Sequence, residues 1–318
     1  MMEPRKPDEP TTIALGCMNF GKRTPAAESE RIIRRALERG VTVFDTANVY
    51  VDGESEKIVG RALRSERDRV TIATKVGAAR VGGRPEGLSR ATIHRAIDES
   101  LRRLGTDYVD VYYLHVPDHA TPIEESLDAM AELHQAGKIR ALGVSNYAAW
   151  QILEMMTIAA ARGAPRPAIS QIMYNLLIRQ IEVEYAPFTR RHPIHDTVYN
   201  PLAGGLLTGR HTRAGETERG SRFEKNRMYK GRYWSDRFFD LVDAYQRVAE
   251  AESMSLVELS YAWLAAQPHV DSILVGPATT SHLDAALDAC NKAVSPEARA
   301  RIDEISVAHL GTDARYVR

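Results

Sequence analysis

The sequence is poor in cysteine, has no excess charge of either sign and contains no long apolar run. Cys17 and Cys290 are the only cysteines among 318 residues, too few for a disulfide framework or a cluster of thiolate metal ligands. The 42 basic and 42 acidic residues cancel, which argues against a surface built to bind nucleic acid. These absences disfavour disulfide-rich, thiolate-metal and nucleic-acid-binding proteins.

Membrane and secretion signals are also missing. No run of about 18 apolar residues is present, so no transmembrane helix is predicted. The first ten residues, MMEPRKPDEP, are polar and proline-rich and lack the apolar core of a signal peptide. We expect a cytoplasmic protein that does not contact membranes, with residues 1–10 flexible.

Short β-branched runs alternate with helix-like segments along the whole chain, and the 44% hydrophobic composition is ample for a large core. Strands are expected at residues 12–16, 41–45, 69–75, 108–115, 140–146, 168–175, 195–200 and 271–276, with helical segments after them. Such alternation indicates a parallel sheet. Eight units in this length predict a closed (β/α)₈ TIM barrel, an α/β fold, in a single domain over residues 1–318. A doubly wound open sheet is the alternative, but no G-x-G-x-x-G turn follows any strand.

Two local features refine this prediction. The polar segment 208–236, after the seventh strand, is too long for an ordinary βα connection, and its aromatic residues favour a lid or pocket wall. The helix expected near 122–136 carries a start pattern in which Thr121 caps the helix and Glu124 completes a capping box.

Polar side chains close the apolar strands one after another. Reading the strand ends in order gives Asp45, Lys75, His115, Ser145 with Asn146, Gln171, and Tyr199. A single polar residue at a strand end usually just meets solvent. In a TIM barrel, however, the carboxyl ends of the strands carry the active site, so a series of such residues predicts one.

The segment VTVFDTANVY, residues 41–50, suggests what this site does. Asp45 and Lys75 end neighbouring strands and can pair, and Tyr50 follows in the loop above them. A phenol beside an ammonium is expected to have a pKa below its usual value of about 10. Such a tyrosine can donate a proton to a carbonyl oxygen, with His115 orienting that oxygen or relaying the proton.

Other chemistries remain as alternatives. Lys75 can be the Schiff-base nucleophile of a barrel lyase or aldolase, although a partner such as Asp45 would keep it protonated. His115 and His119 have H-x-x-x-H spacing, but Pro117 lies between them and no third metal ligand is evident, so no metal is predicted. The segment GVSN lacks the final glycine of a nucleophile elbow, which disfavours a serine hydrolase.

Taken together, these motifs resemble the aldo-keto reductase superfamily from about residue 11 to the C-terminus. FDTANVY, IATKV, YYLHVPD, GVSN, QIMYN, YNPLAGGLLTG and ILVGPATTSHL each resemble a segment of that family. LHVPDHATPIEESL, LGVSNYAAW and YKGRYW are similar to its aflatoxin aldehyde reductase (succinic semialdehyde reductase) branch. The resemblance implies reduction of aldehydes and ketones to alcohols by hydride transfer from NADPH, and a homodimer. A third alternative is a non-enzymatic, nucleotide-sensing subunit of the same fold.

The resemblance also implies roles for individual residues. Asp45, Tyr50, Lys75 and His115 would form the catalytic tetrad. The cofactor-binding set would be Gly16, Cys17, Met18, Asp45, Ser145, Asn146, Gln171, Tyr199, Asn200, Pro201, Leu202, Gly204, Leu206, Arg210, Arg222, Gly276, Ala278, Thr279, Thr280 and His282. Within it, the side chains of Ser145, Asn146 and Gln171 would bind the nicotinamide carboxamide, and Tyr199 would stack on the ring.

Two points are less determined. Related adenosine-side segments carry fixed charges where this chain has Pro277, Ala278 and His282, so NADP(H) is expected with NAD(H) as the alternative. The substrate would meet Tyr50 and His115, and we add Asn19, Val49, Arg232, Trp234 and Arg318 as candidate pocket residues. Arg232 and Arg318 would suit a substrate carboxylate; two solvated arginines, and aromatic core packing for Trp234, are the alternative interpretations.

Overall fold

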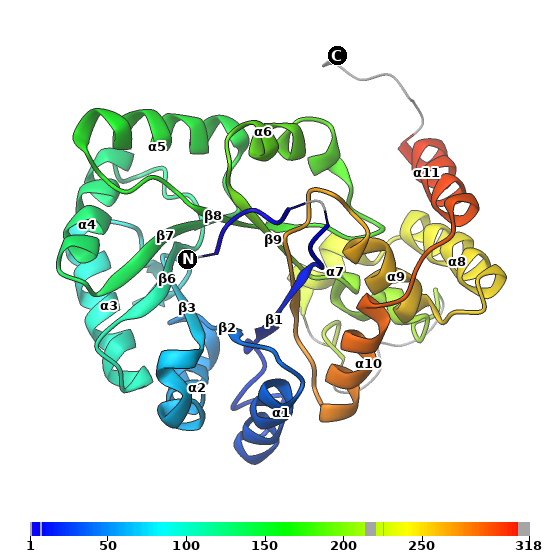
Figure 1. The fold of residues 1–318 in the computed structure, drawn as a ribbon, viewed down its shortest axis with the longest axis horizontal. Helices are drawn as coiled ribbons and strands as arrows, with labels where there is room; N and C mark the ends of the chain where they lie inside the picture. Colours follow the sequence, from blue (N-terminus) through cyan, green and yellow to red (C-terminus); the bar gives the residue numbers. More distant parts are fainter. Residues whose placement is uncertain (1, 7, 214–220, 225, 311–318) are drawn as a thin grey trace.

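In the computed structural model, eight parallel strands close into a barrel surrounded by helices (Figure 1). The structure describes residues 2–6, 8–213, 221–224 and 226–310; Arg318 lies outside them. The strand order around the barrel is β1, β10, β9, β8, β7, β6, β3, β2. These strands are β1 (Thr12–Gly16), β2 (Val43–Asp45), β3 (Thr71–Val76), β6 (Val109–Leu114), β7 (Ile139–Ser145), β8 (Ile169–Met173), β9 (His195–Tyr199) and β10 (Ser272–Val275). The predicted (β/α)₈ barrel is confirmed.

Helices follow the strands and cover the outside of the barrel (Figure 1). They are α1 (Ala26–Glu38), α2 (Glu54–Ala62), α3 (Arg90–Leu104), α4 (Ile123–Gln135), α5 (Ala149–Arg162), α6 (Tyr185–Arg191), α7 (Arg227–Tyr233), α8 (Asp236–Ala251), α9 (Leu256–Ala265), α10 (Thr280–Cys290) and α11 (Pro296–Leu310). Among the described helices, none has the length and apolar character needed to cross a membrane.

The alternation of side chains along each strand divides the core into an inner and an outer part. Ala73, Val111, Tyr113 and Ile169 pack inside the barrel, whereas their sequence neighbours Ile72 and Tyr112 pack outward in a larger cluster. Because successive side chains of a strand point to opposite faces, Val111, Tyr113 and the residue two positions further on, His115, share the inner side. This periodicity places the functional side chains of the strand ends over one mouth of the barrel.

Gly143 in β7 makes room for the largest inner side chain. A Cβ atom at this position would lie 2.4 Å from Cδ1 of Tyr113, on the neighbouring strand β6. Only glycine leaves space for the ring, which fills the barrel interior directly beneath Lys75, whose Nζ is 5.6 Å from the ring centroid.

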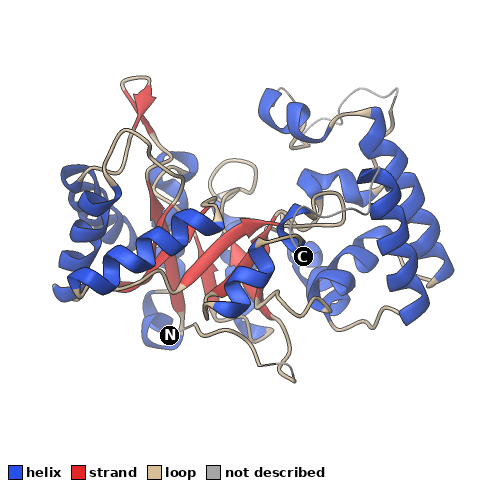
Figure 2. Cartoon of the chain, turned by 90° about the horizontal axis from the view of Figure 1, so that it is seen from above, coloured by secondary structure: helices blue, strands red, loops and turns tan. Residues whose placement is uncertain are grey.

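Short helices and one hairpin occupy the loops; among them are η2 (Arg64–Arg69) and η3 (Gln180–Glu182). The 3-10 helices η1 (Tyr50–Gly53) and η4 (Ala203–Thr208) follow β2 and β9, and α7 lies in the long segment after β9. The strands β4 (Arg80–Val81) and β5 (Arg84–Pro85) form a hairpin after β3, which projects from one end of the barrel in Figure 2. At the opposite end, the backbone N–H of Arg5 donates to Asp271 Oδ1 at 2.7 Å, just before β10.

The predicted capping box at Thr121 is wrong. Pro122 occupies the cap position of α4 and makes no side-chain cap bond. The Thr121 hydroxyl donates instead to Asp118 Oδ2 at 2.7 Å. That carboxylate also accepts from the backbone N–H groups of Ala120 and Leu88, and its charge makes it the stronger acceptor.

Candidate active site

A buried ion pair lies at the centre of the barrel mouth. The Lys75 side chain is fully buried, and its ammonium donates to Asp45 Oδ1 and to the Thr46 carbonyl oxygen, the latter at 2.8 Å. The second carboxylate oxygen of Asp45 accepts from Gln171 Nε2 at 2.9 Å. Taking two charges out of water is costly. Here the cost is offset because both partners are hydrogen-bonded on several sides.

Tyr50 and His115 lie beside this pair. Lys75 Nζ is 5.1 Å from the centroid of the Tyr50 ring. The Tyr50 and His115 rings meet edge to face, with centroids 5.8 Å apart. The structure thus brings together four side chains: three at the ends of β2, β3 and β6, and Tyr50 at the start of η1.

The pKa shifts at the site follow from burial. Burial, and then the Lys75 charge, lowers the pKa of His115 to about 3, so the imidazole is neutral at ordinary pH. No hydrogen-bond partner among the described residues reaches its buried Nδ1. Burial also lowers the pKa of Lys75, although Asp45 acts in the opposite direction.

The expected lowering of the Tyr50 pKa is wrong. Burial first, and then the Asp45 charge, raises the pKa of Tyr50 well above its usual value. The physical reason is that the Lys75 ammonium is matched by the Asp45 carboxylate, so no net positive charge faces the phenol. Tyr50 is therefore a neutral phenol that carries its proton across the ordinary pH range.

Residues expected to bind the nicotinamide gather at the ends of β7, β8 and β9. Asn146 follows Ser145 in a left-handed conformation, with φ of 64°. Its Nδ2 donates to Ser145 Oγ and to the His115 carbonyl oxygen, both at 3.0 Å, and its Oδ1 accepts from the Tyr199 hydroxyl at 2.7 Å. Burial raises the pKa of Tyr199 to about 12, while the Arg232 charge acts against it. These contacts fix the Tyr199 ring over the mouth of the barrel.

The segment after β9 folds back as a tight glycine-containing loop. Asn200 Oδ1 accepts from the Gly204 N–H at 2.8 Å, and Asn200 Nδ2 donates to the Tyr233 hydroxyl at 2.6 Å. Gly204 has φ of 71°, and a Cβ there would lie 2.7 Å from Cδ1 of Tyr229. Glycine is thus required both by the backbone and by the ring that packs on it. The loop contains five of the predicted cofactor residues, Asn200, Pro201, Leu202, Gly204 and Leu206.

Arg222 lies at the end of β10, and its charge acts on Arg23 of the first βα loop. Arg222 Nη1 donates to the Tyr229 hydroxyl at 2.8 Å, and its Nη2 lies 3.5 Å from the position that a Cβ on Gly276 would take. Partial burial, and then the nearby Arg222 charge, lowers the pKa of Arg23. Two arginines within range of each other suit an anion, and Arg23 is a residue that the sequence reasoning missed. Its signal is a basic pair, Lys22 and Arg23, in the first βα loop.

The remaining cofactor candidates are placed as follows. The backbone N–H of Cys17 donates to the Asp45 carbonyl oxygen at 2.9 Å, and burial raises the pKa of its thiol. Thr279 caps α10 by accepting from the His282 N–H at 3.2 Å. Exposed or half-buried positions are taken by Met18, Arg210, Ala278, Thr280 and His282, and Gly16 ends β1 beside β10.

The substrate candidates among the described residues are placed as follows. Asn19 is buried and Val49 directly precedes Tyr50 at the site. Arg232 lies near Tyr199, as its effect on the pKa of that residue indicates. Trp234 packs against Phe223 and Phe239, with ring centroids 5.0 and 5.2 Å away, inside an aromatic cluster of the long insert. Among the described residues, no three His, Cys, Asp or Glu side chains come together as metal ligands.

Comparison with known proteins identifies this arrangement. Residues 12–307 match the model of the Aldo/keto reductase family. The chain belongs to this family. Aldo-keto reductase family 7 member A3 of Homo sapiens is 36% identical over 321 residues, covering 95% of each chain. Aflatoxin B1 aldehyde reductase member 2 of Homo sapiens is 35% identical over 297 residues, covering 88% of this chain and 82% of the relative.

More distant similarities agree with the family. The structure of the glycerol dehydrogenase AKR11B4 from Gluconobacter oxydans has a TM-score of 0.80 and 30% identity, covering 100% of this chain and 98% of that chain. A probable voltage-gated potassium channel subunit beta of Arabidopsis thaliana is 34% identical over 280 residues, covering 86% of this chain and 85% of the relative. The chain is an oxidoreductase of the aldo/keto reductase family that reduces carbonyl groups with a nicotinamide cofactor, and the predicted branch is confirmed. The potassium-channel relative does not favour the regulatory alternative.

Proposed function

We propose that this reductase acts on aldehydes with NADPH and that Tyr50 supplies the proton. The observation that carries the proposal is the buried Lys75–Asp45 pair with the Tyr50 ring above the ammonium, 5.1 Å from Nζ to the ring centroid. A neutral phenol at the barrel mouth can protonate the oxygen of a carbonyl group as that oxygen gains negative charge.

Each neighbour of Tyr50 has a separate task in this proposal. In the resting site Asp45 balances the charge of Lys75. Once Tyr50 has given up its proton, the ammonium would attract the new negative charge and so stabilise the phenolate. Asp45 keeps the ammonium oriented. His115, neutral because its pKa is about 3, can donate a hydrogen bond to the substrate oxygen without attracting a proton of its own.

The residues around the site fit a nicotinamide dinucleotide. When bound, the reduced nicotinamide supplies the hydride. Ser145, Asn146 and Gln171 would hold its carboxamide, and Tyr199 would face its ring. The positive side chain of Arg222 beside Gly276, with Arg23 near enough to be influenced by its charge, supports a phosphate-binding role.

We infer a preference for NADP(H) over NAD(H) from these two arginines. The segment 276–282, GPATTSH, offers hydroxyl groups but no fixed charge. The guanidiniums on the facing loops would replace the missing charge and bind the additional phosphate of NADP(H).

The experiment that tests the catalytic assignment is Tyr50→Phe. We expect kcat for 4-nitrobenzaldehyde to fall by about 10²–10⁴, since a general acid contributes that much. NADPH binding, followed by quenching of tryptophan fluorescence, should stay nearly unchanged. Full activity of the variant would refute the role of Tyr50, and very slow turnover of the unmodified protein with tight NADPH binding would favour the nucleotide-sensing alternative.

A further inference from the structure

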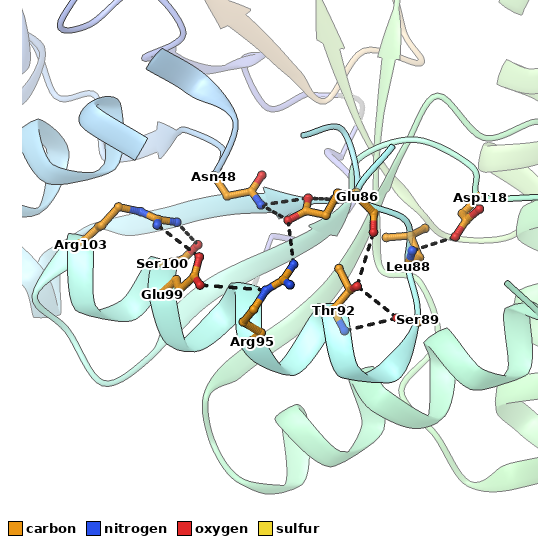
Figure 3. Close-up of polar contacts among 11 residues, drawn as sticks. Asn48, Glu86, Leu88, Ser89, Thr92, Arg95, Glu99, Ser100, Arg103 and Asp118 are labelled. Atoms are coloured by element: carbon orange, nitrogen blue, oxygen red, sulfur yellow. Dashed lines mark hydrogen bonds and ion pairs between the residues drawn. The ribbon is translucent and has the colours of Figure 1, made fainter. Parts of the chain in front are cut away.

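Glu86 lies outside the proposed tetrad, yet its carboxylate binds Asn48 and Gly77, each two residues from a tetrad member. The residue follows the β4–β5 hairpin and precedes α3, and its side chain is only 5% exposed. Its oxygens accept from Asn48 Nδ2 at 3.0 and 3.1 Å (Figure 3). One of them also accepts from the Gly77 N–H at 2.9 Å. Arg95 Nη2 is 3.8 Å away, so the buried charge has one cationic neighbour.

The two groups that Glu86 binds belong to the two segments carrying Tyr50 and Lys75. Asn48 is two residues before Tyr50, and Gly77 is two residues after Lys75. The backbone of Asn48 also donates to the Lys75 carbonyl oxygen at 3.2 Å. One carboxylate therefore connects the loop that bears the phenol to the strand end that bears the ammonium.

Glu86 is itself firmly held. Its backbone N–H donates to the Ala79 carbonyl oxygen at 2.8 Å, and two residues later the Leu88 N–H donates to Asp118 Oδ2 at 2.8 Å. Gly77 has φ of 106°, and a Cβ there would lie 2.6 Å from Cδ2 of Leu88, so the chain at this point has little freedom. The carboxylate is a fixed anchor rather than a mobile surface group.

We infer that Glu86 is a positioning residue of this reductase, which keeps the Tyr50 phenol in register with the Lys75 ammonium through Asn48 and Gly77. The inference rests on the proposed roles of Tyr50 and Lys75. A shift of the loop by a fraction of an ångström would move the phenol relative to the ammonium and the substrate oxygen, and small displacements of reacting groups lower kcat strongly.

The test begins with Glu86→Gln. The amide keeps one acceptor oxygen, but its NH₂ group replaces the other and cannot accept from both Asn48 Nδ2 and the Gly77 N–H. We expect kcat to fall roughly tenfold or more, whereas KM for NADPH and its binding constant stay within about twofold. Asn48→Ala removes the same bond from the other side and serves if the first variant does not fold. Glu99→Gln is the matched control: Glu99 also neighbours Arg95, at 4.0 Å, and among the described residues its ion pairs are with Arg95 and Arg103 on its own helix (Figure 3).

The double variant Glu86→Gln, Asn48→Asp, which exchanges the carboxylate and the amide, gives the sharpest test of this contact. The single change Asn48→Asp sets two carboxylates against each other, whereas the double variant lets the introduced amide donate to the new carboxylate and accept from Gly77. Recovery of kcat to within about threefold of the unmodified enzyme is expected. If Glu86 only supported the fold, the single variants would keep the kcat of the unmodified enzyme. Only their melting temperature would fall, and the double variant would regain it.

The outcomes separate this inference from the proposal on which it rests. An unchanged kcat in Glu86→Gln and Asn48→Ala, together with an inactive Tyr50→Phe, would overturn the role of Glu86 alone. An equal loss in Glu99→Gln would also overturn it. Full activity of Tyr50→Phe would overturn both proposals.

Discussion

The rings of Tyr50 and His115 meet edge to face, with their centroids 5.8 Å apart and their planes inclined by 82°. The contact places a neutral phenol and a neutral imidazole side by side above a buried ion pair. Neither ring changes charge between pH 5 and 8, because burial raises the pKa of Tyr50 and lowers that of His115 to about 3. We therefore expect little change of kcat/KM from titration of these two rings in this range.

His115 should make the protein sensitive to acid. Its pKa is about 3 in the folded state and about 6.5 when unfolded, so between these values the unfolded chain binds more protons and stability falls as the pH falls. The contribution to the loss between pH 7.5 and pH 5 is about 2 kcal/mol. His115→Asn should remove this part of the pH dependence, measured by urea denaturation at both pH values. An identical pH dependence in the variant would contradict the assignment.

Asp45→Asn should destabilise the fold as well as abolish activity. It leaves the fully buried Lys75 ammonium without its charge partner, a loss of about 3–5 kcal/mol in the free energy of unfolding. Adding Lys75→Met removes the stranded charge, so the double variant should regain much of the stability while staying inactive. Denaturant titration measures both effects. A double variant as unstable as Asp45→Asn would show that the pair is not what stabilises this region.

Arg222→Gln should weaken NADPH binding by about tenfold or more, since a charge-assisted contact to phosphate is lost. The loss for NADH should be smaller, because NADH lacks the additional phosphate. Fluorescence titration with both cofactors measures the two constants. Arg213→Gln is the control, as this exposed arginine pairs with Asp240. Equal losses for both cofactors would contradict the proposed selectivity.

Gly143→Ala should destabilise the barrel by about 1–3 kcal/mol, because the added methyl group would meet the Tyr113 ring. The displaced ring would press toward Lys75, so kcat should fall too. Gly231→Ala is the contrast: nothing lies within 4 Å of a Cβ there, and the helical position should gain about 0.5–1 kcal/mol. Thermal unfolding of both variants tests the pair, and a neutral Gly143→Ala would show that the interior tolerates the methyl group.

The fold and the tetrad positions were predictable because they follow short-range rules. The period of two along a strand puts Tyr113 and His115 on one side of β6, and parallel strands bring their carboxyl ends to one mouth. Asp45 and Lys75 lie on adjacent strands, so their pairing needs no further information than strand order.

Contacts made by loops were not predictable in the same way. Asn48 meets Glu86, 38 positions later, only because the β4–β5 hairpin and the start of α3 fold back over the barrel mouth. The direction of the Tyr50 pKa shift was mispredicted, because burial and the Asp45 carboxylate, which neutralises the Lys75 ammonium, outweigh that ammonium. The short helix α7 also escaped notice, since its seven residues show too little periodicity.

Gln171 joins two tasks in one side chain. Its amide nitrogen donates to the carboxylate that holds Lys75, while the same amide is expected to meet the nicotinamide. Any rotation of this amide on cofactor arrival would alter the orientation of Asp45 and, through it, of the ammonium beside the phenol. The position of the Lys75 ammonium would then depend on whether the hydride donor is bound. This dependence would give a direct structural reason for ordered addition, in which the dinucleotide binds before the aldehyde.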